Sequence, residues 1–260
     1  MHTFPLSTSA PRSRDAVRHE PRRRTLVVLR RREVAGGLVR LTLGGDDLAG
    51  FTSLGPEDHV KLFVPGADGA LVGRDYTPSE FRPLGASSGP ELDLDVVVHV
   101  GASGPASDWA AAAREGDRVE VGGPRGSKLA PAGFRNALLI ADPTGLPALR
   151  RWVRAFAGVL PVHAVLFGGA AAHYLDEAEV LAATPQVLEP HHDLLEVVRT
   201  QDVDDDTFVW AAGEASALVP VRRHLKEQGL PKTNRSLHGY WKRGDAGFDH
   251  HAPLDPADPD

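Results

Sequence analysis

Gly73-Arg74-Asp75-Tyr76-Thr77-Pro78 is the stretch that decides the fold, and Gly104-Pro105-Ala106-Ser107-Asp108-Trp109 follows it downstream. In an extended segment, Arg74, Tyr76 and Thr77 are expected to place a cation, an aromatic plate and a hydroxyl on one face, because strand side chains alternate. Such a set suits a flat heteroaromatic ring that carries a phosphate. Gly104 to Ser107 forms a small-residue turn before a helical pattern, and the bare N–H groups of a helix N-terminus bind anions. Together they predict a pocket for a dinucleotide flavin, although each motif alone also occurs as an ordinary strand or as a turn with an N-cap.

The composition is that of a globular protein, with 260 residues, 42% hydrophobic and 25% charged, which predicts one large or two modest domains. No apolar run approaches the length of a membrane helix. The sequence has no cysteine, which excludes disulfides, thiolate metal sites, iron–sulfur clusters and a cysteine nucleophile. Redox chemistry therefore needs an organic cofactor or a bound substrate metal. No metal site is predicted, because His191-His192 and His250-His251 are adjacent pairs whose side chains diverge.

The net charge of −6 is unevenly distributed, since residues 1–32 hold nine arginines against Asp15 and Glu20. A basic arm on an acidic body can indicate nucleic-acid binding, but no aromatic residues interleave with these arginines. We therefore expect residues 1–22 to be a flexible arm that binds no nucleic acid. The twin arginines lack a following apolar core long enough for a secretory signal, so a cytoplasmic protein is expected.

Residues 23–132 are predicted to form an antiparallel β-barrel domain. Strands are expected at 25–30, 38–43, 58–65, 74–77, 91–99 and 117–124, and a helix at 107–114. Short strands at close spacing, with one helix and many glycines, are typical of a small barrel.

From about residue 134 the pattern changes to strands that alternate with helices. Continuous apolar runs, typical of strands buried on both faces, occur at 136–142, 162–168 and 207–213. Shorter strands are expected at 186–189 and 236–242, and helices at 147–156, 194–200 and 216–227. The alternation predicts a parallel α/β nucleotide-binding domain over 133–244, followed by a flexible tail over 245–260.

Ligands of such sheets bind beyond the carboxyl ends of the strands. Asp142, Thr144 and the helix that starts at Pro147 are therefore expected to face a nicotinamide nucleotide, although each also fits a helix cap or a tight turn. Trp210-Ala211-Ala212-Gly213-Glu214 ends another strand at the same edge. The Gly-x-Gly-x-x-Gly fingerprint of dinucleotide-binding folds is absent from the sequence.

The order of these motifs resembles the siderophore-interacting protein family, the flavin-dependent ferric-siderophore reductases of the ferredoxin-reductase-like group. The resemblance covers nearly the whole chain after residue 24. In the first half it is carried by Asp58-His59-Val60-Lys61-Leu62-Phe63, Arg74-x-Tyr76-Thr77-Pro78, His99, Gly104-Pro105-Ala106-Ser107-x-Trp109-Ala110 and Gly123-Pro124-Arg125-Gly126-Ser127. In the second half it is carried by Asp142-x-Thr144-x-Leu146-Pro147-Ala148, Trp210-Ala211-Ala212-Gly213-Glu214 and Gly239-Tyr240-Trp241-Lys242-Arg243-Gly244.

The resemblance implies bound FAD, NADPH or NADH as the electron donor, and a ferric siderophore as the acceptor. Arg74 would pair with the flavin phosphate, Tyr76 would lie against the isoalloxazine, and Thr77 would hydrogen-bond near its reactive nitrogen. The pyrophosphate and adenosine side would be held by His99, Gly104, Pro105, Ala106 and Ser107. The nicotinamide side would be lined by Asp142, Thr144, Trp210 and Glu214. An anionic ferric chelate would meet the basic side chains of Lys61, Arg125, Lys242 and Arg243.

Two positions depart from the family pattern. Where the family commonly has an arginine two residues after the threonine of Arg-x-Tyr-Thr, this chain has Ser79, so one cation is missing unless Arg82 replaces it. Where the family usually reads Gly-Asp-Glu-Thr, this chain has Ala141-Asp142-Pro143-Thr144, and Pro143 removes a backbone donor from the turn.

The leading hypothesis is a monomeric NAD(P)H-dependent, FAD-containing ferric-siderophore reductase that reduces chelated Fe(III) to Fe(II) for iron release in the cytoplasm. The flavin would carry the chemistry, so no catalytic side chain is predicted. One alternative is a flavin-dependent oxidoreductase with another acceptor, such as a diaphorase or a tailoring enzyme of secondary metabolism. The other is a non-catalytic binder of a nucleotide or a chelate.

Overall fold

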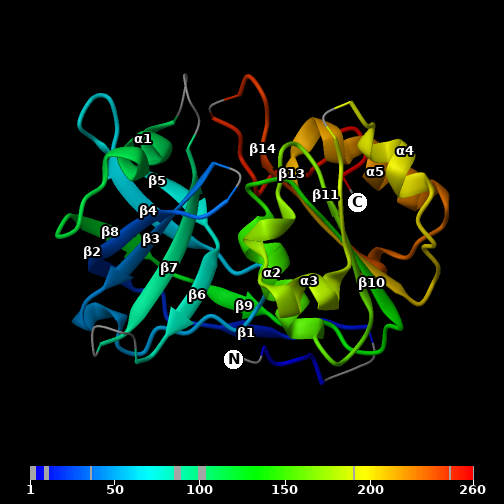
Figure 1. Ribbon diagram of the computed structural model, residues 1–260, viewed down its shortest axis with the longest axis horizontal. Coiled ribbons are helices and arrows are strands. Elements are labelled where there is room, and N and C mark those ends of the chain that lie inside the picture. The colour runs from blue at the N-terminus through cyan, green and yellow to red at the C-terminus, as the bar shows by residue number, and fades with distance from the viewer. Residues whose placement is uncertain are drawn as a thin grey trace. The chain divides into compact units, whose positions relative to one another are not determined.

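A computed structural model describes residues 4–8, 12–35, 37–84, 89–98, 104–189, 191–245 and 247–259. The chain divides into two compact units, one of Met1–Leu6 with Arg14–Ala130 and one of Ser7–Ser13 with Pro131–Asp260 (Figure 1). The division after Ala130 lies close to the predicted boundary between 132 and 133. In the described part of the chain, no helix is both long and apolar enough to cross a membrane.

The first unit is built on a curled antiparallel sheet whose seven strands follow the order β5-β4-β8-β2-β3-β7-β6. Its elements are β2 (Arg23–Glu33), β3 (Leu38–Gly44), β4 (Val60–Pro65), β5 (Leu71–Tyr76), β6 (Pro78–Arg82), β7 (Glu91–Val97), α1 (Pro105–Ala112) and β8 (Arg118–Gly122), with a 3₁₀ turn at Asp46–Leu48. The antiparallel β architecture predicted for this half is confirmed, and this sheet has one strand more than the six expected.

The additional strand is β6, which starts only one residue after β5 ends. The two strands lie at opposite edges of the sheet, so Thr77 alone carries the chain from one edge to the other. The sequence predicts a single strand at 74–77 and none at 78–82. Proline is tolerated as the first residue of an edge strand, where its missing N–H breaks no ladder bond.

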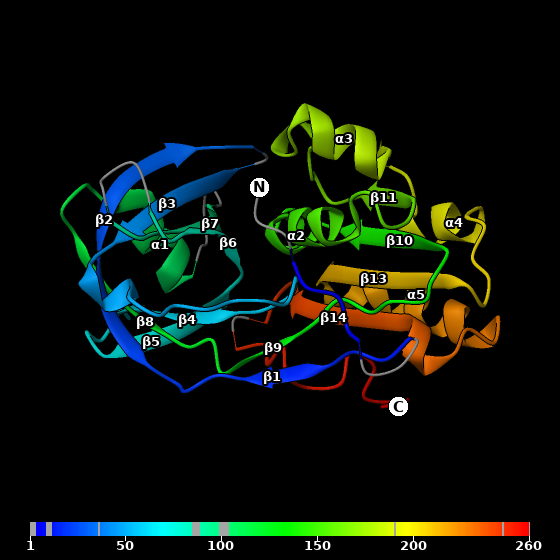
Figure 2. The same ribbon diagram turned by 90° about the horizontal axis from the view of Figure 1, so that it is seen from below.

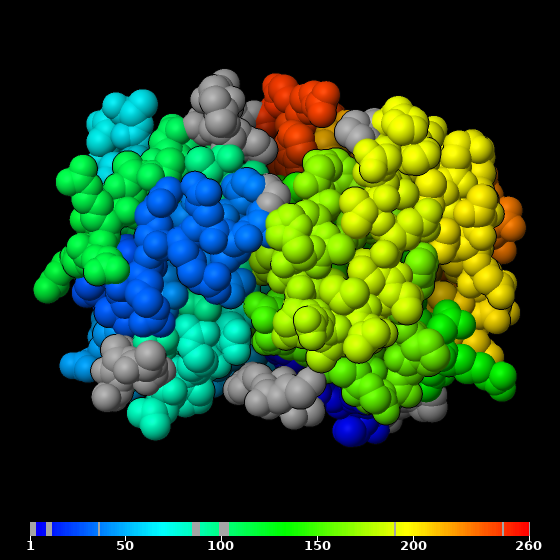
Figure 3. Space-filling model, in the orientation of Figure 1, coloured from blue at the N-terminus to red at the C-terminus, as the bar shows by residue number. Residues whose placement is uncertain are grey.

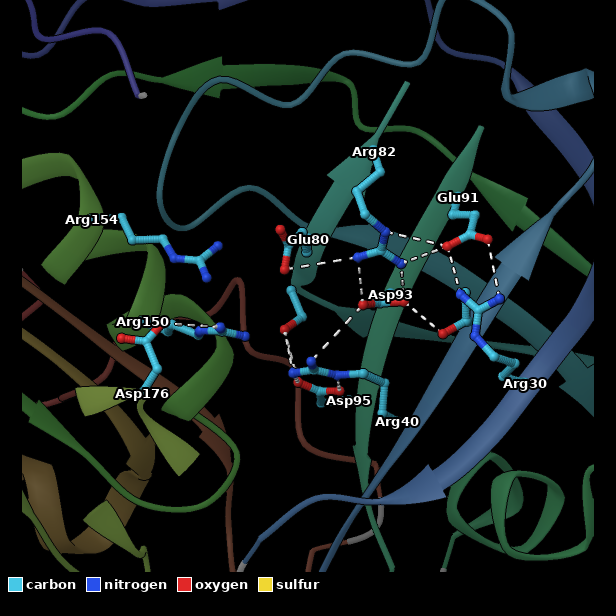
Figure 4. Close-up of polar contacts among 12 residues, drawn as sticks. Arg30, Arg40, Glu80, Arg82, Glu91, Asp93, Asp95, Arg150, Arg154 and Asp176 are labelled. Atoms are coloured by element: carbon cyan, nitrogen blue, oxygen red, sulfur yellow. Dashed lines mark hydrogen bonds and ion pairs between the residues drawn. The ribbon is translucent and has the colours of Figure 1, made fainter. Parts of the chain in front are cut away.

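Both faces of β3 and β7 are buried, but their chemistry differs. One face contributes leucines such as Leu41, Leu43, Leu92 and Leu94 to the apolar core. The alternating positions on the same strands carry polar side chains that are also buried, namely Arg40, Thr42, Glu91, Asp93 and Asp95. Figure 4 shows that Arg40, together with Arg30 of β2 and Arg82 of β6, binds the carboxylates of β7, which is what allows this face to be buried.

A short strand lies inside the segment 1–22, for which the sequence predicts a flexible arm. β1 (Ala16–Arg18) pairs antiparallel with β9 (Gly126–Lys128) in a separate two-stranded sheet. Arg14 is nearly buried, and its guanidinium donates to Glu57 at 2.5 Å and to the carbonyl of Leu129 at 2.9 Å. Backbone pairing and a shielded ion pair hold this segment, and neither leaves a periodic signal in so short a sequence.

The second unit contains a parallel sheet with the strand order β12-β11-β10-β13-β14, which confirms the predicted α/β class. Its strands are β10 (Asn136–Ala141), β11 (Val162–Leu166), β12 (Pro185–Val187), β13 (Thr207–Glu214) and β14 (Arg235–Trp241). Its helices are α2 (Leu146–Phe156), α3 (Glu177–Ala183), α4 (Leu194–Arg199) and α5 (Ala215–Glu227), with 3₁₀ turns at Ala172–Tyr174 and Lys232–Asn234.

Helices cover both faces of this sheet, α2 and α3 on one side and α4 and α5 on the other (Figures 1 and 2). On the α2 face, Trp152 packs among Phe156, Phe208 and Trp210. On the opposite face, residues of β10 and β13 meet the apolar side of α5, as the buried cluster that includes Ile140 shows. In Figure 3, α3 and α4 form much of the visible surface of this unit.

The segment 245–260, predicted to be a flexible tail, contacts α5 through charged groups. Asp255 is buried and accepts hydrogen bonds from Arg223 at 2.6 and 3.0 Å. Asp258 accepts from Lys226 at 2.6 Å and from Arg222 at 3.2 Å. The bonds from Arg223 and Lys226 hold the pKa of Asp255 and Asp258 below the usual range. Charge complementarity with a helix, which composition alone does not show, holds the tail against the unit.

Candidate functional site

Arg74 and Tyr76 lie on β5, at one edge of the curled sheet. They stand opposite Leu62 and Val60 of β4, so both project from the face that carries the apolar core. The Arg74 side chain is exposed at this edge, and its guanidinium donates to the carbonyl of Gly73 at 3.0 Å. Tyr76 packs against the core, and burial raises the pKa of its phenol to about 12. The edge therefore presents a solvent-exposed cation beside a neutral aromatic ring.

Thr77 does not share this alternation, because it directly follows Tyr76 and lies outside β5. The prediction that three side chains share one strand face therefore holds only for Arg74 and Tyr76. Thr77 is buried at the seam between β5 and β6.

Lys61 projects from the opposite face of the same strand pair. It stands opposite Asp75 in the β4–β5 ladder, and its ammonium group donates to the Asp75 carboxylate. Because directly paired residues share a face, Lys61 and Asp75 lie together on the side away from Arg74 and Tyr76. The register thus separates Lys61 from Arg74 and Tyr76, and its predicted contact with an anionic ferric chelate stays a prediction.

The predicted anion-binding turn precedes α1. Gly104 is its exposed N-cap with extended backbone angles (φ −90°, ψ 166°), and no atom of the described chain lies within 4 Å of a Cβ built there. Pro105 opens the first turn, Ala106 is buried, and the hydroxyl of Ser107 donates to the carbonyl of Val97 at 2.9 Å. First-turn N–H groups have no partner within a helix, so an open N-terminus suits a phosphate. His99 lies outside the described residues.

The donor set of this unit fits FAD. The isoalloxazine needs an aromatic surface, the phosphates need a cation and backbone N–H groups, and the adenosine side needs room for close approach. Arg74, Tyr76 and the open turn at Gly104 supply these three features within one unit.

Ser79 is buried in a network of charged groups. Its hydroxyl donates to Asp95 at 2.8 Å and accepts from Arg40 at 3.1 Å, while the Arg40 guanidinium binds both Asp95 oxygens at 2.7 Å. The cation beside Ser79 is thus Arg40, which belongs to β3, a strand distant in sequence. Arg82 does not take this place, because its guanidinium binds Glu91 and Asp93 (Figure 4).

Asp142 follows β10 and is almost completely buried, with 2% of its surface exposed. Its Oδ1 accepts from the N–H and hydroxyl of Thr144 at 2.8 and 2.5 Å and from the N–H of Gly145 at 3.3 Å. Its Oδ2 accepts from the N–H of Glu214 at 2.9 Å and the indole Nε1 of Trp241 at 2.7 Å. Burial raises the pKa of the Asp142 carboxyl, and these hydrogen bonds act in the opposite direction.

The Asp142 carboxylate lies at the amino end of α2. It accepts the N–H groups just before α2, where the helix dipole favours negative charge. Pro143 costs this arrangement nothing, because the donors come from the residues after it. Gly213, at φ +151°, completes the enclosure, since a Cβ there would lie 2.6 Å from the Asp142 carboxyl carbon.

The other residues predicted to line the nicotinamide side differ in how they are used. Trp210 is fully buried, with its ring centroid 6.2 Å from that of Trp152, and has no exposed surface for a ligand. Glu214 is partly exposed and caps α5, since its Oε2 accepts from the N–H of Ala217 at 2.8 Å. Thr144 is also partly exposed, at the carboxyl edge of the sheet.

Three of the basic residues predicted to meet a ferric chelate are exposed. Lys242 and Arg243 directly follow β14, and the N–H of Arg243 donates to Glu214 Oε1 at 3.1 Å. Arg125 follows β8 in the first unit, where its backbone carbonyl accepts from the N–H of His19 at 3.0 Å.

Sequence reasoning missed two side chains that organise these sites. Trp241 belongs to a quoted motif, but nothing in the sequence shows that its indole donates to Asp142, which lies 99 residues earlier. Arg40 reads as one polar position in an alternating strand, and its bond to Asp95 is equally non-local. A polar residue opposite an acidic one in a paired register is the only signal that could have identified Arg40.

Comparisons with known proteins agree with this architecture. Residues 134–244 match the siderophore-interacting protein family, and residues 27–72 and 64–128 match the siderophore-interacting FAD-binding domain. An NADPH-dependent ferric-chelate reductase of Escherichia coli is 34% identical over 264 residues, which cover 90% of this chain and 98% of that protein. A ferric acinetobactin reductase of Acinetobacter baumannii is 26% identical over 200 residues, 73% of this chain and 68% of that protein.

Among solved structures, a siderophore utilization protein from T. fusca superposes with a TM-score of 0.80. It is 33% identical in sequence, and the match covers 92% of this chain and 100% of that one. The family matches together span most of both units, and the fold agrees along nearly the whole length. This chain belongs to the siderophore-interacting protein family.

Proposed function

We propose that this chain is an FAD-dependent oxidoreductase that uses NADPH to reduce Fe(III) held in a siderophore. The observation that carries the proposal is the sheet edge of the first unit, where exposed Arg74 and half-buried Tyr76 meet the seam at Thr77. The similarity to an NADPH-dependent ferric-chelate reductase over 98% of its length supports the choice of donor and acceptor.

FAD, when bound, would supply the redox chemistry, namely a hydride acceptor for NADPH and a one-electron donor for chelated Fe(III). Arg74 neutralises a phosphate of the cofactor, and Tyr76 covers one face of its ring system. The phenol stays protonated at physiological pH, since its pKa is raised to about 12, so it brings no negative charge near the ring. The turn at Gly104 to Ser107, which opens α1, holds the pyrophosphate.

In this proposal exposed basic side chains attract an anionic ferric chelate, and the candidates are Lys242 and Arg243 in the second unit and, separately, Arg125 in the first. Thr144 and Glu214 border the nicotinamide side, and the buried carboxylate of Asp142 supports that edge from within. A cytoplasmic site, a monomeric state and the absence of nucleic-acid and membrane partners belong to the same proposal.

The test is an anaerobic visible spectrum of the purified protein with FAD, followed by NADPH and then by a ferric hydroxamate or catecholate. We expect the flavin absorbance to bleach with NADPH and to return quickly when the ferric chelate is added. Flavin that binds but does not return faster with the chelate than without it would overturn the choice of acceptor. A protein that binds no flavin would overturn the assignment of Arg74 and Tyr76.

A further inference from the structure

One buried carboxylate links the strand ends at the carboxyl edge of the sheet in the second unit. Asp142 directly follows β10, and its two oxygens accept from the turn before α2, from the end of β13 and from the end of β14. The donor from β14 is the indole of Trp241, at 2.7 Å, which is short for a neutral donor and typical of a charge-assisted bond. Three strand ends thus meet at a single side chain.

A bulge in the last strand pair brings Trp241 to this position. Gly213 pairs with Gly239, but the next pair is Glu214 with Trp241, so Tyr240 has no opposite residue in β13. A bulge redirects the side chains that follow it, and such bulges are frequent beside functional sites. Without the extra residue, Tyr240 rather than Trp241 would stand opposite Glu214.

The residues directly after Trp241 are the exposed pair Lys242 and Arg243, here called the basic pair. Trp241 is held by Asp142, and the N–H of Arg243 is held by Glu214 Oε1 at 3.1 Å. The backbone N–H of Glu214 is in turn bonded to Asp142. Lys242 therefore lies between two anchored residues, although its own ammonium group is exposed to solvent.

We propose that Asp142 is a positioning residue, which through Trp241 and Glu214 sets the direction in which the basic pair meets an anionic ligand. The proposal deepens the proposed function and rests on it, since the anionic ligand is the ferric chelate. Asp142 does not touch the chelate, because it is buried and its oxygens are occupied by protein donors. Through Trp241 and the basic pair, its effect is on the binding of charged chelates rather than on electron transfer.

The decisive variant is Trp241→Phe, which removes the indole N–H and keeps an aromatic ring. Asp142→Asn is the second variant, since an amide cannot accept at both positions. The matched control is Asp204→Asn, because Asp204 likewise accepts from Thr207 Oγ1 at 2.7 Å and from the N–H of Asp206, but at the amino end of β13. It changes a similar turn far from the basic pair.

Each variant is loaded with FAD and assayed with two acceptors, an anionic ferric tris-catecholate and an uncharged ferric tris-hydroxamate. For Trp241→Phe we expect KM for the anionic chelate to rise about threefold to fivefold, the upper end of the effect of losing an exposed charge interaction. The kcat for both chelates and KM for the uncharged one should stay within about twofold. Asp204→Asn should change neither KM, even if its thermal unfolding midpoint falls.

Equilibrium binding of the ferric tris-catecholate to the oxidised enzyme, without NADPH, separates this inference from the proposed function. If the wild type binds the chelate but does not reduce it, the proposed function fails, and a weaker Kd in Trp241→Phe still supports positioning. If the wild type reduces it and the variant has the same KM and Kd, positioning is overturned. Equal changes for both chelates would also overturn it, as would a wild type that binds neither.

Amide hydrogen exchange provides a direct structural readout. In the wild type, the N–H of Arg243 should be protected by its bond to Glu214. We expect faster exchange at this amide in Trp241→Phe and in Asp142→Asn, and unchanged exchange in the control. Unchanged protection in both variants would show that the basic pair does not depend on Asp142.

Discussion

The sheet edge of the first unit and the carboxyl edge of the second carry the two halves of the predicted chemistry, and they are built in opposite ways. In the first unit, Arg74 at this edge and Gly104 before α1 are exposed, and the Arg74 guanidinium donates to the neighbouring carbonyl of Gly73. At the second edge, Asp142 and Trp210 are buried. The Asp142 carboxylate is hydrogen-bonded to protein donors, and the Trp210 ring packs against other side chains. Residues of a predicted site can therefore either contact the ligand or support those that do, and exposure distinguishes the two.

The largest expected effect tests the supporting role of Trp210. Trp210→Ala should lower the free energy of unfolding by about 3–5 kcal/mol, since the side chain is fully buried against other rings. Chemical denaturation of the FAD-free protein measures this change. Trp210→Phe should cost less because it retains a ring. An alanine variant with normal stability and impaired use of NADPH would instead make Trp210 a ligand contact.

Arg74 should behave in the opposite way. Arg74→Ala should weaken FAD binding roughly tenfold to a hundredfold, the value of a charge-assisted hydrogen bond, and leave the unfolding of the FAD-free protein unchanged. Fluorescence titration with FAD measures the affinity. Arg118→Ala, at another exposed arginine of the first unit, is the control. Equal FAD affinity in wild type and Arg74→Ala would remove the main support for the flavin site.

The pH dependence of stability tests the environment of Tyr76. Burial raises the pKa of this phenol from 10.0 to about 12, so its neutral form is favoured in the folded state. The stability that this provides is complete below pH 10 and is lost as the pH rises toward 12. The wild type should therefore lose stability relative to Tyr76→Phe only above pH 10. A loss already present at pH 8 would contradict the burial.

Substitution of Ser107 should show the smallest effect. This residue combines features of ligand-contacting residues and of supporting residues. Ser107→Ala removes the bond to the carbonyl of Val97 and should cost about 1 kcal/mol of stability. If its hydroxyl also accepts or donates to the pyrophosphate, FAD affinity should fall several-fold as well. Ser107→Thr, which keeps the hydroxyl, should restore both. Loss of stability alone would place Ser107 with the supporting residues.

Much of the fold could be predicted from the sequence because its signals are local. The buried runs that became β10 and β13, and the helical pattern of α2, are visible within a dozen residues. The site was harder, because its decisive contacts join distant positions. The bond from Trp241 to Asp142 and the bond from Arg40 to Asp95 depend on strand order and register, which periodicity does not specify.

The prediction from local sequence patterns was also wrong at the junction of β5 and β6, where two signals conflicted. Pro78 indicates a break, and the chain does leave β5 there, but the next residues pair immediately with β7. Arg74, Tyr76 and Thr77 looked like one face, yet the strand ends before the third of them. Tests of the basic pair and of Arg74 will show whether the resemblance assigned the remaining residues correctly.

The one-residue link at Thr77 has a consequence for how this family can vary in length. A single residue that joins the two edges of a sheet leaves no slack, so an inserted residue would move β6 by one position along β7 and turn its side chains to the other face. The exposed turn between β4 and β5, residues 66–70, has no such restriction and should accept insertions. Among homologues we therefore expect length differences at the turn and constant length at the link.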